Sequence, residues 1–184
     1  MVDREFDLLV GMHNMWGHAI GYEMVAKRDS DPSLFSEACS EMINSGVVSL
    51  CLRILASFQS LQSPVDGNPG AVIMAVCCLQ LICHAPGLAM RILQPSANRA
   101  GVSYTPMQVH QMLMHCIEVG HQVPDCVGIN LRIKAVNVLA LLFGRTEEDE
   151  DGVEAVAAGD TPVTVPATLI RESVHKLSQI LRSA

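Results

Sequence analysis

Residues 70–84 read GAVIMAVCCLQLICH and carry no charged side chain. Val72, Val76, Leu79 and Ile82 recur at helical spacing, and the polar residues form no stripe wide enough to face water. A helix that is apolar on all sides is either buried on all sides or lies in a membrane. The stretch therefore predicts a central helix against which other segments pack.

A near-copy of this stretch follows sixty residues later in the chain. Two central helices of the same kind predict a repeated, layered helical fold. The aligned pairs are Ala75 with Ala135, Val76 with Val136, Leu79 with Leu139, Leu81 with Leu141, and Ile82 with Leu142.

Three dipeptides mark the starts of helices. Asp31-Pro32, Asn68-Pro69 and Thr105-Pro106 each place a capping side chain before a proline at the first helical position. Thr105 and Gln108 also have the spacing of a capping box. No strand pattern competes, so the expected fold class is all-α. The expected helices span 4–26, 32–44, 47–61, 69–85, 87–94, 106–121, 130–143 and 166–182, with loops at 94–105 and 122–128.

The net charge of −7 comes from one stretch. We expect residues 145–165 to form an acidic, flexible linker, because a charged stretch with few large apolar residues offsets little of its ordering entropy. The rest of the chain carries 12 acids and 12 bases, which argues against a general electrostatic attraction to nucleic acid. The seven acids are Glu147, Glu148, Asp149, Glu150, Asp151, Glu154 and Asp160.

The composition predicts a buried core that is rich in free thiols. Of the seven cysteines, six lie inside apolar helical patterns, which suits a reducing compartment and favours a cytoplasmic protein. The first residues resemble neither a secretory signal nor a basic transit peptide. Because 49% of the residues are hydrophobic and only 17% are charged, we expect part of the apolar surface to be covered by other protein subunits or by self-association.

Two kinds of segment resemble the armadillo repeat, a helical unit of α-solenoid proteins. INSGVVSLCLRIL at 43–55 is similar to the family's glycine turn and second helix, and AVCCLQLI and AVNVLALL are similar to its third helix. The resemblance covers 33–143 and implies a right-handed superhelix of about two repeats with flanking helices. The domain boundaries that follow are 1–144 for the repeat domain, 145–165 for the linker and 166–184 for a C-terminal amphipathic helix.

The resemblance implies a non-enzymatic scaffold for protein–protein interaction, or a structural subunit of a larger assembly. Leu81 and Leu141 stand where many peptide-binding members of the family carry asparagine, so recognition of an extended nuclear-signal peptide is not expected. The alternative is a helical accessory subunit of a membrane-associated complex. Residues 67–90 contain no charge and are long enough to span a bilayer, but Pro86 and Gly87 interrupt them.

Two groups of residues invite chemistry, and neither has the spacing that the chemistry needs. The first group, three histidines and two cysteines between residues 110 and 126, lacks the paired ligands such as CxxC that structural zinc sites usually show. Cys83 and His84 are neighbours on one helix and so point in different directions. We therefore expect no catalytic residue, no metal and no cofactor. The first group comprises His110, His115, Cys116, His121 and Cys126.

Candidate partner contacts lie near the two ends of the chain. The only tryptophan is interpreted first as a packing anchor, and the segment 166–182 has one apolar side that is able to dock on this domain or on another chain. The candidate contact residues are Trp16, Leu169, Val174, Leu177 and Leu181.

Overall fold

The computed structural model describes residues 31–61, 68–85, 87–94, 103–123, 125–143 and 175. All regular elements within these ranges are helices, so the predicted all-α class is confirmed there. The expected helix at 4–26, the linker at 145–165 and all of the C-terminal helix except His175 lie outside the described residues. The elements are α3 (Pro32–Asn44), α4 (Val47–Gln59), α5 (Pro69–Cys83), the 3₁₀ helix η3 (Ala89–Leu93), α6 (Pro106–Val119), the 3₁₀ helix η5 (Gly120–Gln122) and α7 (Asp125–Phe143).

The three predicted helix starts are confirmed, because the capping bonds form as the sequence indicates. The Leu34 amide donates to Asp31 Oδ1 at 3.1 Å, and the Ala71 amide donates to Asn68 Oδ1 at 3.2 Å. In the capping box of α6, the Gln108 amide donates to Thr105 Oγ1 at 3.3 Å and the Thr105 amide donates to Gln108 Oε1 at 2.8 Å. These bonds satisfy backbone donors that no helix can satisfy by itself.

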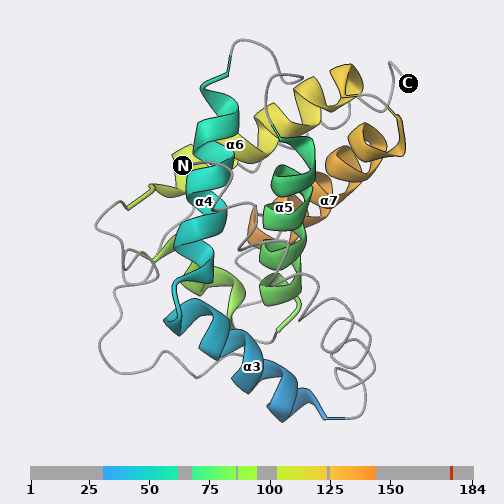
Figure 1. The fold of residues 1–184 in the computed structure, drawn as a ribbon. Coiled ribbons are helices and arrows are strands. Elements are labelled where there is room, and N and C mark those ends of the chain that lie inside the picture. Colours follow the sequence, from blue (N-terminus) through green and yellow to red (C-terminus); the bar gives the residue numbers. More distant parts are fainter. Residues whose placement is uncertain are drawn as a thin grey trace.

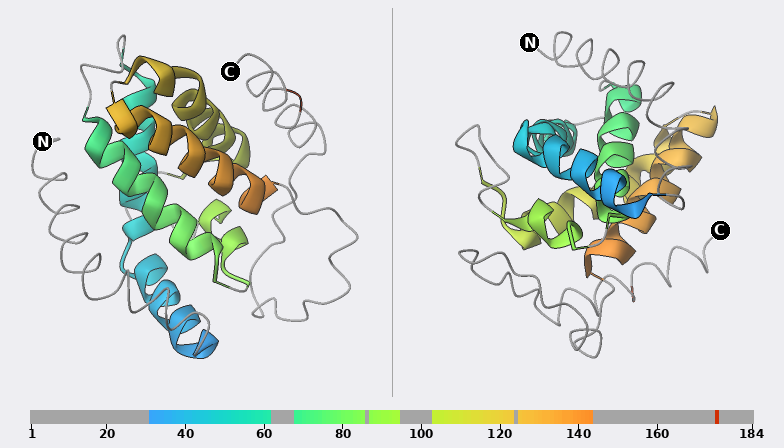
Figure 2. Two further views of the ribbon diagram at one scale, coloured as in Figure 1. Left: turned by 90° about the vertical axis from the view of Figure 1, so that its right-hand side faces the viewer. Right: turned by 90° about the horizontal axis from the view of Figure 1, so that it is seen from below.

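The longer helices form two layers (Figures 1 and 2). One layer pairs α5 with α7, the other pairs α4 with α6, and α4 also packs on α5 while α6 packs on α7. Helix α3 leaves this block at an angle of 61° to α4. Gly46 makes the corner with a φ of 90°, a left-handed conformation that favours glycine.

Helix α5 lies at the centre, as its sequence predicts. Its side chains from Ala71 to Cys83 are all buried or half-buried, and it contacts α3, α4, α7 and η3. The aligned positions of α5 and α7 also have matching burial: Ala75, Ala135, Leu79 and Leu139 are each at most 1% exposed. Of the five aligned pairs, only Val76 and Val136 differ, because Val136 is half-buried.

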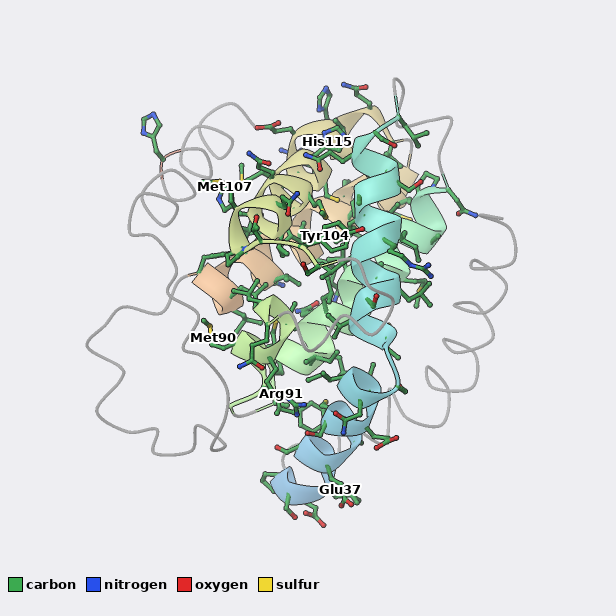
Figure 3. The ribbon with its side chains drawn as sticks, turned by 90° about the vertical axis from the view of Figure 1, so that its left-hand side faces the viewer. Glu37, Met90, Arg91, Tyr104, Met107 and His115 are labelled. Atoms are coloured by element: carbon green, nitrogen blue, oxygen red, sulfur yellow. The ribbon has the colours of Figure 1, made fainter. Side chains whose placement is uncertain are left out.

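Helix α3 is held to the block by a small apolar cluster and by one arginine. Phe35 and Cys39 of α3 pack against Ala85, just after the end of α5. Arg91 of η3 donates to Ser40 Oγ at 2.9 Å and to Asn44 Oδ1 at 3.2 Å, which links η3 to α3 (Figure 3). The predicted helix at 87–94 thus exists only as the five-residue 3₁₀ helix of η3.

The predicted loop at 122–128 is wrong, because α7 begins at Asp125 instead of Asn130. Gly128, the last residue of the expected loop, lies buried inside α7 at a close crossing with η5. A Cβ on Gly128 would collide with the carbonyl oxygens of Gly120 and Val123. The glycine is therefore required by the contact between two segments, and not by a turn.

We expect truncation of the two aligned core leucines to destabilise the fold alike. Leu79→Ala and Leu139→Ala should each lower the free energy of unfolding by about 2–5 kcal/mol, since both side chains are fully enclosed. Urea denaturation followed by circular dichroism measures the change. Leu34→Ala, at a site 42% exposed on α3, is the control and should cost much less. Equal losses at all three positions would contradict the layered core.

Gly128→Ala should destabilise the protein, although alanine is the better helix former by about 1 kcal/mol. The added methyl group has to displace backbone, so the expected loss in the free energy of unfolding is about 1–3 kcal/mol. The matched control is Gly70→Ala, at an exposed position in the first turn of α5, where alanine should be neutral or stabilising. A stabilising Gly128→Ala would refute the close crossing.

Candidate interaction surface

Helix α7 carries an exposed apolar face, which contradicts the prediction that both central helices are enclosed on all sides. Ile129 is 61% exposed and Ile133 is 52% exposed. Cys126 and Ala140 are exposed on the same side of the helix, at spacings of three, four and seven residues. We call these four residues the α7 stripe. It contains no charged side chain.

The opposite side of α7 lies in the core, where Leu131, Ala135 and Val138 are completely buried. Polar residues border the α7 stripe: Asn130 and Asn137 are exposed beside it. The two basic residues of α7, Arg132 and Lys134, are half-buried and flank the stripe on opposite sides. The stripe is thus an apolar strip with a polar and basic border, the usual anatomy of a contact surface.

One aligned pair of residues differs in exposure between α5 and α7. Cys77 of α5 is half-buried, and burial raises the pKa of its thiol while the Lys134 ammonium opposes this effect. In the repeat alignment Cys77 corresponds to Asn137 of α7, which is exposed beside the stripe. At this position the outer side of α7 is thus less covered than the aligned side of α5.

The other large exposed apolar side chains of the described residues stand singly. Leu34 on α3 and Met107 on α6 are each 42% exposed and lie on different helices. Single exposed apolar residues are normal on a protein surface, whereas a continuous strip usually marks a contact site. Among the described segments the α7 stripe is thus the strongest candidate for a binding surface.

The described thiols offer little nucleophilic chemistry. Burial raises the pKa of Cys39 to about 11 and that of Cys116 to about 12, so both thiols are protonated at neutral pH. Cys51 of α4 and Cys78 of α5 share a hydrogen bond, which raises the pKa of Cys51 and lowers that of Cys78. Cys83 is buried, whereas its neighbour His84 is exposed.

The structure does not gather the histidines and cysteines that invited a metal site. The described residues contain no group of three His, Cys, Asp or Glu side chains that could hold a metal ion. His110 is buried, 4% exposed, with its ring edge-on to Phe143 at 5.5 Å between centroids. Cys116 is buried, whereas Cys126 is exposed. His121 is exposed, and its Nδ1 donates to the Glu118 carbonyl oxygen at 2.6 Å.

The predicted contact residues Trp16, Leu169, Val174, Leu177 and Leu181 lie outside the described residues. His175, the single described residue after Phe143, is helical and exposed. Sequence reasoning missed Ile129 and Ile133 as surface residues. The available signal was that their spacing continues from Cys126 to Ala140, but the assumed loop at 122–128 interrupted it.

One described helix segment, Cys126–Phe143, is long and apolar enough to cross a membrane. Within the protein, 39% of this segment is buried. Helix α5 is also apolar, but its 15 residues are too few to span a bilayer comfortably. The pair α3 and α4 passes the same test only if it is counted as one span despite its bend of 61°. Such a test is also passed by core helices of soluble proteins.

We expect His115 of α6 to make the fold sensitive to acid. Its ring packs edge-on against Phe58 of α4 at 5.6 Å between centroids (Figure 3), and burial lowers its pKa below 6.5 while Glu118 opposes the shift. The folded state therefore takes up this proton only at a lower pH than the unfolded state does. The contribution to stability is complete above pH 6.5 and is lost as the pH falls toward the depressed pKa.

We expect the urea midpoint of the wild type to fall between pH 7.5 and pH 5.5, and His115→Asn to reduce this fall. His121→Asn is the control, because His121 is exposed on the short helix that follows α6. If the urea midpoint of His115→Asn falls as much as that of the wild type, the fold does not oppose protonation of the His115 ring.

Comparison with known proteins yields no relative. The chain matches no protein-family model, no curated protein and no solved structure. A proposal of function therefore rests on the contacts and surfaces of the described helices. Among these, the α7 stripe is the apolar surface that the neighbouring helices leave uncovered.

Proposed function

We propose that this protein is a non-enzymatic scaffold for protein–protein interaction, or a structural subunit of a larger assembly, with the α7 stripe at the centre of its contact surface. The observation that carries this function is the exposure of Ile129 and Ile133 on a helix whose other side is core. Water contact with such a strip is unfavourable, and a protein partner removes it.

An armadillo-like superhelix is the proposed architecture. It is supported by the corner at Gly46, by the stacking of α4 on α6 and by the stacking of α5 on α7. In a solenoid each unit contacts only its neighbours, and a terminal unit needs a polar outer face or a partner. The outer face of α7 has the apolar stripe instead of a polar cap.

The chemistry of the described side chains favours binding over catalysis. Burial raises the pKa of Cys39 and Cys116, so these two thiols are protonated at neutral pH. The rings of His110 and His115 pack edge-on against phenylalanine rings. The free thiols favour a reducing compartment such as the cytoplasm. Subunits of a protein assembly are the proposed partners, and nucleic acid is not among them.

The alternative is a helical accessory subunit of a membrane-associated complex. It is favoured by one observation, the length and apolar character of Cys126–Phe143. Against a spanning role, the core side of that segment packs within the protein, and Asn130 and Asn137 would need partners inside lipid. Retention in the membrane fraction after a carbonate wash would favour this alternative.

Affinity capture with the full chain under gentle conditions tests the scaffold function. Ile129→Glu with Ile133→Glu should abolish recovery of the proteins that the wild type retains, because two carboxylates would have to enter an apolar interface. Leu34→Glu with Met107→Glu adds the same charge at sites that are exposed but isolated.

This control pair should recover the same proteins as the wild type. Equal recovery by the stripe variant would refute the α7 stripe as the contact surface. Recovery of no protein by the wild type, at endogenous expression, would refute the scaffold function itself. Circular dichroism of each variant establishes that the helices remain folded.

A further inference from the structure

Two thiols meet in the core where α4 packs on α5. We propose that Cys51 of α4 and Cys78 of α5 are a site of reversible oxidation, at which a peroxide joins their two sulfur atoms in a disulfide. The site lies on helices other than α7, so it does not depend on the proposed function of the α7 stripe.

The contact between the two thiols bridges the helix pair. Cys51 is completely buried, and Val48 and Leu55 on the same side of α4 are buried with it. Cys78 is half-buried and packs against the same core. The two thiols share a hydrogen bond, so their sulfur atoms adjoin. A disulfide, with its sulfur atoms about 2.05 Å apart, would thus form between atoms that already lie side by side.

Cys78 is the thiol of this pair that attacks an oxidant. The hydrogen bond from Cys51 lowers the pKa of Cys78, although burial opposes this effect. The same bond raises the pKa of Cys51, and so does its burial. The nucleophile is a thiolate and not a thiol. Cys78 therefore reacts first, while Cys51 stays protonated beside it.

Cys77 does not replace Cys51 as the second thiol, although it is next to Cys78 in the sequence. Consecutive side chains of a helix are about 100° apart around its axis and do not face each other. Burial raises the pKa of Cys77 and the Lys134 ammonium of α7 opposes this effect, whereas Cys78 contacts α4. Cys51 is thus the thiol that reaches the Cys78 sulfur while α5 stays helical.

The reaction takes two steps, with hydrogen peroxide as the oxidant. The Cys78 thiolate attacks one peroxide oxygen, the O–O bond breaks and hydroxide leaves, so that Cys78 becomes a sulfenic acid. The Cys51 thiol then gives up its proton, its sulfur attacks the Cys78 sulfur, and the S–O bond breaks with loss of the second hydroxide. The two hydroxides take up the two thiol protons. Two thiols and one peroxide therefore yield one disulfide and two waters.

A small-molecule thiol reverses the reaction. Its thiolate attacks the Cys78 sulfur, and Cys51 leaves and takes up a proton. A second small thiol attacks the mixed disulfide, Cys78 leaves, and the two small thiols depart as their own disulfide. Most disulfides of a reducing compartment are transient in this way. While the bond lasts, it joins α4 to α5 and closes the 26 residues between Cys51 and Cys78 into a loop.

Peroxide treatment of the full chain tests the site. Dilute reduced protein is treated with hydrogen peroxide, the remaining thiols are blocked with N-ethylmaleimide, and tandem mass spectrometry of unreduced peptides assigns the linked cysteines. The expected product is a Cys51–Cys78 linkage within one chain, which dithiothreitol removes. Its yield should not change when the protein is diluted.

Cys51→Ala should abolish this linkage and leave Cys78 as a sulfenic acid, which dimedone captures. A thiol already in contact reacts as an intramolecular partner, so we expect about tenfold more dimedone adduct at Cys78 in Cys51→Ala than in the wild type. Cys39→Ala is the matched control, because it also removes a completely buried thiol, one whose Sγ donates to the Leu81 carbonyl oxygen at 3.9 Å. Cys39→Ala and Cys77→Ala should both keep the linkage and the low adduct level of the wild type.

Three outcomes overturn the proposal. In the first, Cys51 and Cys78 of the wild type stay reduced under conditions that oxidise the exposed Cys126. In the second, Cys78 is linked to a cysteine other than Cys51. In the third, Cys78 accumulates as a sulfenic or sulfinic acid beside a free Cys51 thiol. The peptide map of the wild type decides between these outcomes and the expected linkage even if circular dichroism shows that Cys51→Ala does not fold.

Discussion

The burial of α5 is the constraint on which the rest of the structure depends. A helix of 15 residues without a charge has no side that water solvates well, so it needs neighbours all round. Helix α4 covers one side and α7 another, while α3 and η3 close its C-terminal end. The corner at Gly46 follows from this requirement, since α3 can reach the end of α5 only if the chain turns sharply before α4.

The sequence predicts those parts of the fold that local chemistry determines. Asp31, Asn68 and Thr105 cap their helices through bonds within the first turn, so the starts of α3, α5 and α6 were predicted to the residue. The start of α7 was missed because Gly128 has its role in a contact between segments. A glycine that breaks a helix and a glycine that lets another backbone approach look identical in a sequence.

The candidate site was less predictable than the fold, and the repeat alignment explains why. Similar segments imply similar environments, and most aligned core positions of α5 and α7 do share their burial. Exposure of the outer face, however, depends on whether another layer follows, which is a property of the stack and not of the helix. Ile129 and Ile133 are therefore apolar in a pattern that fits burial, and yet they face solvent. His110 shows the reverse, because a polar side chain is enclosed by its contact with Phe143.

The make-up of the α7 stripe favours an exchangeable contact over a permanent one. Burying an isoleucine side chain completely contributes about 1.5–3 kcal/mol, and the stripe offers two that are already about half covered, together with the small side chains of Cys126 and Ala140. Ordering the groups that meet at the contact opposes that gain. A partner that also contacts Asn130, Asn137, Arg132 or Lys134 gains interactions beyond the apolar strip, so the polar border contributes to the choice of partner.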